Sequence, residues 1–284
     1  MTEAAVDAYL DRLGLAARPA PTLEALVDLH RRHLDAVPYD NLAIMLSQVT
    51  GVAPDRPDPR ATLARVAAGG NAGYCFHHNG LVALVLAELG YDVVRRPAQM
   101  LEATGPSGRL EHLVVEVRGL PTEDNPAGRW WPDLGYGDGF RDPLPLVDGV
   151  YHQGPFRYRL VRVGERGWTF HNDPGASSLG SLVGEHVSQD DVDAAHARLA
   201  TPPEGDFTRR LVVQRRDATG AETVRGLRHT RTGEGAFVRD LREYVDWRRA
   251  LVGLGVALTG VDDAALRELH RRMALAHDDW LATL

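Results

Sequence analysis

The sequence Gly73-Tyr74-Cys75-Phe76 carries the only cysteine in a chain of 284 residues. It follows Gly69-Gly70, which predicts a turn, and it precedes a strongly apolar segment from Leu81 to Leu89. This order predicts a thiol at or just before the N-terminus of a buried helix. Because a helix N-terminus favours negative charge, we expect it to lower the pKa of the thiol and to raise the fraction of nucleophilic thiolate. Taken alone, however, a single cysteine is more often a small buried hydrophobic residue than a catalyst.

The composition argues against several classes of protein. The formal net charge is −7, which does not match the basic surface of a nucleic-acid-binding protein. The chain contains no lysine, so an anion site must use arginine, histidine or backbone N–H groups. A single cysteine excludes an internal disulfide and fits a reducing compartment. Neither a secretory signal nor an apolar run of membrane-spanning length is visible, so we expect a cytoplasmic protein without a membrane or nucleic-acid partner.

The pattern of apolar residues divides the chain into three segments and predicts an α+β fold. Residues 1–90 predict a helical bundle, with helices over 4–13, after an N-cap at Thr22, and from Ala61 to Ala68. Residues 91–200 predict an antiparallel sheet or small barrel, with strands Tyr91 to Met100, His112 to Val117, Arg129 to Leu134, Phe156 to Val163 and Gly167 to Asn172. Residues 201–284 combine strand-like segments, Phe207 to Arg215 and Glu222 to Thr230, with helices over Val238 to Val252 and Asp263 to Leu284.

A nucleophilic cysteine needs a base that takes its proton and a third group that orients the base. His112 begins a strand directly after a loop, on the more polar face of that strand. Asp133 lies one strand later, at a position in period with the inward face. Neighbouring strands could hold the two side chains within hydrogen-bond reach, but spacing alone does not establish a triad with Cys75. The alternatives are a buried structural thiol, a histidine bonded to backbone and a carboxylate in a turn.

Several motifs together resemble those of the arylamine N-acetyltransferases. These motifs are Pro38-Tyr39-Asp40-Asn41-Leu42, the cysteine motif with Asn79-Gly80, His112, and Asp133-Leu134-Gly135-Tyr136-Gly137, in the order and approximate spacing of that family. The resemblance covers nearly the whole chain and implies a helical bundle, a central antiparallel β-barrel and a C-terminal α/β lid. It implies a catalytic triad of Cys75, His112 and Asp133, arranged as in cysteine proteases. It also implies substrate contacts from Tyr39, Phe76, Tyr136 and Gly137.

The reaction that this resemblance implies is a two-step acyl transfer. The Cys75 thiolate attacks an acyl thioester, commonly acetyl-CoA, and the acyl group then passes from sulfur to an amine. His112 would hold Cys75 as an ion pair and accept the proton of the amine, while Asp133 would orient the imidazole. Backbone N–H groups near Cys75 and Gly137 are expected to stabilise the oxyanion. No permanently bound cofactor is implied, because acetyl-CoA or another acyl thioester serves as co-substrate.

Some residues around the cysteine depart from the family pattern. Asn71-Ala72-Gly73 and His77 stand where the family usually has Arg-Gly-Gly and a glutamate, so an Arg–Glu pair is missing. This departure leaves the triad unchanged but opens the question of the substrate. The family includes amide synthases that release polyketide chains from carrier-protein thioesters by closing a lactam. Such an enzyme would have an acyl carrier protein as partner, and a non-catalytic relative is a further alternative.

Two other features have competing interpretations. His77 and His78 next to Cys75 suggest a metal site, but no second cluster of ligands pairs with them, so we predict no metal. The glycines from 135 to 139 could cradle a pyrophosphate with their N–H groups or form an ordinary tight turn.

Overall fold

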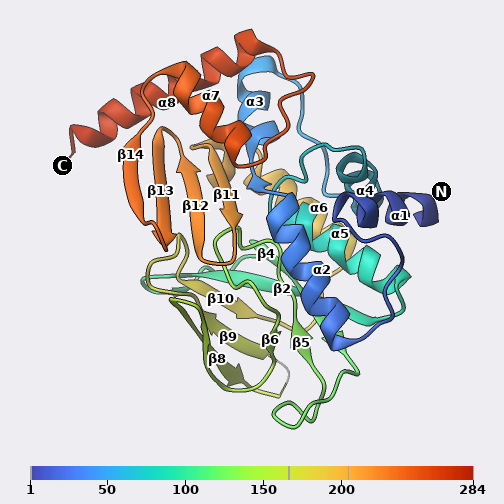
Figure 1. Cartoon of the computed structure of the whole chain (residues 1–284). Coiled ribbons are helices and arrows are strands. Elements are labelled where there is room, and N and C mark those ends of the chain that lie inside the picture. Colours follow the sequence, from blue (N-terminus) through green and yellow to red (C-terminus); the bar gives the residue numbers. More distant parts are fainter. Residues whose placement is uncertain (1, 166, 204, 284) are drawn as a thin grey trace.

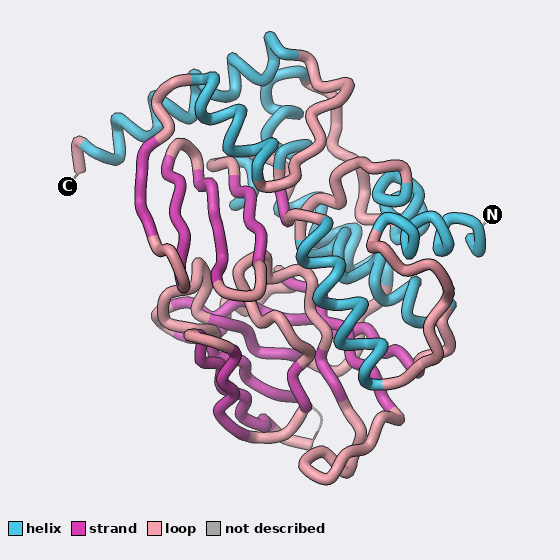
Figure 2. The backbone as a smooth tube through the Cα atoms, viewed as in Figure 1, coloured by secondary structure: helices cyan, strands magenta, loops and turns pink. Residues whose placement is uncertain are grey.

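The computed structural model describes residues 2–165, 167–203 and 205–283, and it confirms the expected α+β class. Helices of the N-terminal part lie beside a large antiparallel sheet, and a second sheet carries the C-terminal helices (Figures 1 and 2). In the described part of the chain, no helix combines the length and apolar character that a bilayer-spanning segment needs.

Five helices form the N-terminal part: α1 (Thr2–Arg12), α2 (Leu23–Ala36), α3 (Leu42–Thr50), α4 (Pro59–Ala67) and α5 (Cys75–Glu88). The expected N-cap of α2 is confirmed, because the Thr22 hydroxyl accepts the Ala25 N–H at 3.2 Å. Helix α3 was absent from the sequence prediction. Its apolar residues Leu42 and Met45 pack against C-terminal helices far along the chain, so its partners are not visible in the local sequence.

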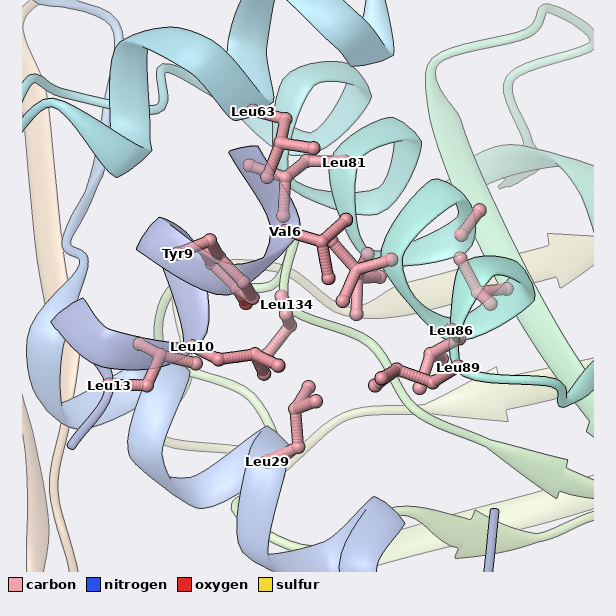
Figure 3. Close-up of a cluster of buried hydrophobic side chains, with 14 of the residues drawn as sticks. Val6, Tyr9, Leu10, Leu13, Leu29, Leu63, Leu81, Leu86, Leu89 and Leu134 are labelled. Carbon is pink, nitrogen blue, oxygen red and sulfur yellow. The ribbon is translucent and has the colours of Figure 1, made fainter. Parts of the chain in front are cut away.

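The core of the bundle also includes residues of the large sheet. Figure 3 shows Leu134, from a loop of the sheet region, among the side chains of the helices. Val115 and Val117 of strand β4 (His112–Arg118) join the same cluster and are fully buried. The apolar helix α5 is covered from its first turn onward, which confirms that the segment after Cys75 forms a buried helix. This packing fixes α5 against β4.

The large sheet is antiparallel and forms a nearly closed barrel in the order β6-β5-β4-β2-β10-β9-β8-β7, with β3 paired to β2. The other strands are β2 (Asp92–Glu102), β3 (Gly105–Pro106), β5 (Trp130–Trp131), β6 (Leu144–Pro145), β7 (Gly149–Gln153), β8 (Phe156–Val163), β9 (Gly167–His171) and β10 (Gly180–Val183). The prediction of one strand from Arg129 to Leu134 is wrong, because β5 ends before Pro132, which has no N–H to donate. Asp133 therefore lies in the loop after β5.

A buried carboxylate marks the far end of β4. Glu116 is 0 % exposed and accepts hydrogen bonds from Arg96, from Arg118 at 2.9 Å and from Arg129 at 2.7 Å. Burial raises the pKa of Glu116, but the bonds from the three guanidinium groups outweigh this effect and lower it to about 2. The buried negative charge of Glu116, on the face of this strand that we predicted to be polar, is thus neutralised by three arginines inside the protein.

The second sheet has the order β1-β11-β12-β13-β14 and contains β1 (Tyr39–Asp40), β11 (Val212–Arg216), β12 (Gly220–Arg225), β13 (Arg228–Gly233) and β14 (Phe237–Asp240). Helices α7 (Tyr244–Gly253) and α8 (Asp263–Leu281) lie along it (Figure 1). The pairing of β1 with β11 brings Tyr39 from the N-terminal part to this C-terminal layer. We keep the division at residues 90 and 200 into bundle, barrel and lid as a proposal.

Three further expectations differ from the structure. Glu222 to Thr230 is not one strand, because a turn at Gly226, with φ of +60°, separates β12 from β13. The helix expected from Val238 begins later, because residues 237–240 form strand β14. Residues 189–199 form a helix, α6 (Gln189–Leu199), within the segment that was predicted to be sheet. A short 3-10 helix, η1 (Asp206–Thr208), precedes β11. Met1 and Leu284, the ends of the predicted segments, lie outside the described residues.

Candidate active site

Cys75 is the first residue of α5 and is 2 % exposed. Its Sγ–H group donates to the carbonyl of Glu111 at a distance of 3.6 Å. The sulfur therefore lies beside the residue that precedes His112. Cys75 and His112 both line a cavity of about 280 Å³, together with Tyr39, Tyr136, Gly137 and several residues of the C-terminal sheet.

The imidazole of His112 is bonded to the carboxylate of Asp133. Its Nε2–H group donates to Asp133 Oδ2 at 2.8 Å, and both side chains are buried. Because a carboxylate oxygen accepts, Nε2 is the nitrogen that carries the proton. No hydrogen bond to Nδ1 is found among the residues that the structure describes, so this nitrogen is available as a proton acceptor.

Asp133 receives four hydrogen bonds, two on each oxygen. Asn79 Nδ2 and the Gly135 N–H donate to Oδ1, each at 2.8 Å. His112 Nε2 at 2.8 Å and Trp131 Nε1 at 2.9 Å donate to Oδ2. A carboxylate with four donors is fully satisfied and held in one orientation. It can therefore fix the orientation of the imidazole.

Asn79 and Trp131 were missed as site residues by the sequence analysis. Asn79 lies one helical turn after Cys75, and it also donates to the Leu113 carbonyl at 2.5 Å and accepts the Leu134 N–H at 2.9 Å. It thereby ties α5 to β4 and to the loop that carries Asp133. The spacing of Asn79 from Cys75 on one helix was a usable signal, because residues four apart lie on the same helix face. For Trp131 the signal was its spacing of two residues from Asp133, which places both side chains on one face of an extended segment.

The pKa of the Cys75 thiol differs in direction from the sequence expectation. Burial raises it, the negative charge of Asp133 raises it further, and the N–H groups of Phe76 and Leu113 lower it by less. The helix N-terminus alone therefore does not produce a thiolate in this site, and the expected lowering of the pKa is wrong for the isolated thiol. An anionic sulfur here needs a cation beside it.

The residues predicted to contact substrate do not all reach the cavity. Tyr39, Tyr136 and Gly137 line it, and the ring of Tyr136 lies 4.3 Å from that of His112 between centroids. Phe76 is fully buried beside Tyr74 in an apolar cluster and does not line this cavity.

Two glycines after Asp133 are required by close packing. A Cβ atom on Gly135 would lie 2.8 Å from Cys75 Cα, and one on Gly137 would lie 2.8 Å from Tyr39 Cβ. Contacts this short force a neighbouring atom to move, so glycine is the residue that fits here without displacing Cys75 or Tyr39. The loop is a packed wall of the cavity, which gives a structural reason for its glycines without a bound pyrophosphate.

The histidines next to Cys75 are bonded inside the protein. His78 Nδ1 lies 2.8 Å from His33 Nε2, and His77 Nε2 lies 3.2 Å from the carbonyl of Asp55. Burial lowers the pKa of His77 to about 3 and that of His78 to about 4, so both are neutral at pH 7. Over the described ranges of the chain, no group of three or more His, Cys, Asp or Glu side chains is placed to hold a metal ion.

Comparison with known proteins links this arrangement to acyl-transfer enzymes. The model of an N-acetyltransferase family matches residues 22–249. The arylamine N-acetyltransferase of Mycobacterium tuberculosis is 35 % identical over 144 residues, which are 50 % of this chain and 49 % of the relative. Proansamycin X synthase of Amycolatopsis mediterranei is 34 % identical over 158 residues, 55 % of this chain and 58 % of the relative. In sequence, the chain thus spans about half the length of the curated relatives that it matches.

The similarity to solved structures covers more of the chain than the similarity in sequence does. The solved arylamine N-acetyltransferase of M. smegmatis superposes with a TM-score of 0.80 at 25 % identity, covering 95 % of this chain and 97 % of that one. The corresponding structure from M. tuberculosis gives a TM-score of 0.78 at 26 % identity, with 95 % and 99 % covered. Structural similarity therefore extends over nearly the whole chain.

Proposed function

This chain belongs to the arylamine N-acetyltransferase family, and on that premise we propose that it moves an acetyl group from an acyl thioester, in the first place acetyl-CoA, through Cys75 to an amine. One observation carries the proposal. Cys75 and His112 line the same cavity, and the imidazole of His112 is hydrogen-bonded to Asp133 behind it. The three side chains come from a helix, a strand and a loop that are far apart in sequence, and apolar packing alone does not require that they meet.

In the first half of the reaction, Cys75 becomes acylated. His112 Nδ1 takes the thiol proton, and the resulting imidazolium supplies the cation that the buried sulfur needs. The sulfur attacks the thioester carbonyl, a new C–S bond forms, and the bond from that carbon to the CoA sulfur breaks. The leaving CoA thiolate takes the proton from His112, so that charge and protons balance. Throughout this step Asp133 stays anionic and stabilises the imidazolium.

In the second half, the amine attacks the acyl carbon on Cys75. His112 Nδ1 accepts the proton that the amine nitrogen loses, the C–S bond to Cys75 breaks, and the amide product leaves. The protein returns to the thiolate–imidazolium pair or its neutral equivalent. For the oxyanion that forms in both halves, the supporting geometry is the first turn of α5, where the N–H groups of Cys75 and Phe76 have no acceptor within the helix, together with Gly137 in the cavity wall.

The test is the mass of the intact protein after incubation with acetyl-CoA. We expect a gain of one acetyl group, and because Cys75 is the only cysteine, no other thiol can carry it. The matched control is Cys75→Ser, which should gain none under the same conditions. Wild-type protein that gains no acetyl group from acetyl-CoA, while its thiol remains free for alkylation, would exclude acetyl-CoA as donor.

A second function is favoured by one of the relatives, whose name, proansamycin X synthase, describes a synthase and not an acetyltransferase. An amide synthase would use the same three residues on a longer acyl chain carried by an acyl carrier protein. Loading of Cys75 by a longer thioester, without loading by acetyl-CoA, would support this function. Failure of every thioester to load Cys75 would instead indicate a non-catalytic relative.

A further inference from the structure

Three arginines converge beside the Cys75 cavity. Arg210, Arg225 and Arg228 line a second cavity of about 200 Å³ between the turn that joins β12 to β13 and helix α8. The wall contributed by α8 includes His277 and Trp280. Arg210 and Arg225 also line the Cys75 cavity, so the two cavities adjoin. We call Arg210, Arg225 and Arg228 the arginine pocket.

The charges of the arginine pocket are poorly compensated. Arg225 and Arg228 are direct partners in the register of the β12–β13 hairpin, where like charges destabilise the pair. Arg228 lies 3.9 Å from a carboxylate oxygen of Asp240 and 5.2 Å from the ring centroid of Trp280. Within the described residues, the side chains of Arg210 and Arg225 have neither an ion pair nor a hydrogen bond, and both arginines are exposed.

This lack of partners contrasts with several other arginines of this acidic protein. The net charge is −7, and other arginines find carboxylates nearby. Arg31, for example, makes two bonds to Asp142, and Arg231 makes two bonds to Asp217. A positive cluster next to the nucleophile of such a chain, with two of its three guanidinium groups free of an ion pair in the described residues, creates a local field that attracts an anion.

The two cavities are also connected electrostatically through Tyr39. Burial raises the pKa of Tyr39, the charge of Cys75 raises it further, and Arg225 lowers it. Tyr39 thus lies within electrostatic reach of both the sulfur and the arginine pocket.

We propose that the arginine pocket binds the phosphate of a phosphopantetheine arm whose thioester end reaches Cys75. This inference rests on the acyl transfer proposed above. Guanidinium groups bind phosphate oxygens with paired, charge-assisted hydrogen bonds, and arginine is the only long cationic side chain in this protein. The same phosphate chemistry belongs to free CoA and to the arm of an acyl carrier protein. The pocket therefore selects phosphorylated thioesters over simple ones.

The test compares two acetyl donors that share a thioester but differ in phosphate. Acetyl-CoA carries phosphates, whereas S-acetyl-N-acetylcysteamine carries none. The quantity measured for each protein is the ratio of the two second-order rate constants for acetylation of Cys75. For Arg225→Gln and for Arg210→Gln we expect this ratio to fall about tenfold or more, because each variant loses charged hydrogen bonds to phosphate.

The matched control is Arg209→Gln, which removes the same charge one residue away from Arg210 and lines neither cavity. Its ratio should stay within about twofold of wild type, since screening weakens exposed charges that do not touch the ligand. An unchanged ratio in both pocket variants, or an equal fall in the control, would overturn the assignment of the pocket.

A third donor identifies the source of the phosphate. If S-acetyl-4′-phosphopantetheine is as efficient as acetyl-CoA, one phosphate suffices, as it would on a carrier-protein arm. If acetyl-CoA is clearly more efficient, the nucleotide end of free CoA contributes. In both cases the advantage over the phosphate-free donor must depend on Arg225, and an advantage independent of Arg225 would refute the inference.

Binding of CoA itself separates this inference from the proposed function. Calorimetry with unacylated CoA needs no reaction at Cys75. If no thioester acetylates the wild-type protein, the proposed function fails, while CoA binding that Arg225→Gln and added salt both weaken would still support the pocket. Equal CoA affinity in wild type and Arg225→Gln would show that the phosphate binds elsewhere.

Discussion

The role of Asp133 is best tested by Asp133→Asn, because the structure specifies all four donors to this side chain. An amide offers one acceptor oxygen in place of two, so its NH₂ group must face two donors whichever way it turns. If it faces Asn79 and Gly135, each loses its partner at a cost of about 1–3 kcal/mol in the free energy of unfolding. If it faces His112, the ring must change tautomer, and Nδ1 then carries a proton and cannot take one from Cys75.

The effect on the reaction follows from the lost charge. The imidazolium formed during acylation would have no buried carboxylate beside it, and breaking a buried ion pair costs about 3–5 kcal/mol. Each 1.4 kcal/mol changes a rate about tenfold. We therefore expect Asp133→Asn to acetylate Cys75 roughly 10² to 10⁴ times more slowly, as measured by quenched reactions and intact mass at saturating acetyl-CoA.

Alkylation of Cys75 by iodoacetamide gives a second readout. In wild type we expect alkylation at neutral pH, because the imidazolium of His112 stabilises the thiolate. Asp133→Asn removes the negative charge that raises the thiol pKa, but it also removes the carboxylate that stabilises the imidazolium of His112. Because burial, the larger cause of the raised thiol pKa, remains and the thiolate loses its cation, the alkylation profile should move to higher pH.

The control for this experiment is Trp131→Phe. It removes one bond to Asp133 Oδ2, the one at 2.9 Å, but keeps the carboxylate charge and most of the ring packing. We expect it to slow acetylation about tenfold, the lower end of the value of a single charged hydrogen bond, because the carboxylate keeps its charge and its three other donors. The reasoning is refuted if Asp133→Asn acetylates within tenfold of wild type with an unchanged alkylation profile.

Three further perturbations follow from the same structure. Asn79→Ala removes the bonds that tie α5 to β4 and to the Asp133 loop, and urea unfolding should show a loss of about 2–5 kcal/mol. Glu116 has a pKa of about 2 in the folded protein and about 4.3 in the unfolded chain, so the free energy of unfolding of wild type should decrease as the pH falls from about 5 to 2. Glu116→Gln should be less stable than wild type at pH 7, and its free energy of unfolding should decrease less over that pH range. Gly135→Ala places a methyl group 2.8 Å from Cys75 Cα. The rate of Cys75 acetylation, measured by quenched reactions, should fall more than tenfold, while circular dichroism shows that the fold is retained.

Local patterns in the sequence were sufficient for several elements of the site. The apolar run after Cys75 placed the thiol at the start of a buried helix, and α5 begins at this residue. The alternation from His112 placed that residue at the start of a strand, as in β4. Both predictions depend only on periodicity and on turn residues nearby, which act over a few residues.

Other elements were not predictable from local sequence. The prediction assigned no element to the segment of helix α3 and placed the segment of α6 in a sheet, because the apolar faces of both helices are matched by partners distant in the chain. Asp133 was expected in a strand, but Pro132 ends β5 and places it in a loop. The division of Glu222 to Thr230 into two strands depends on a turn at Gly226, whose left-handed backbone was not apparent from composition.

By itself, then, the amino-acid sequence determined which side chains are able to do the chemistry, since thiol, imidazole and carboxylate are fixed by residue type. Only the tertiary structure decided how they behave. It gave Asp133 its donors Asn79 and Trp131, and it buried Cys75 so that the thiol pKa rises. The physical reason is that hydrogen bonds and desolvation depend on which distant segments come together, and this proximity is a property of the packed chain.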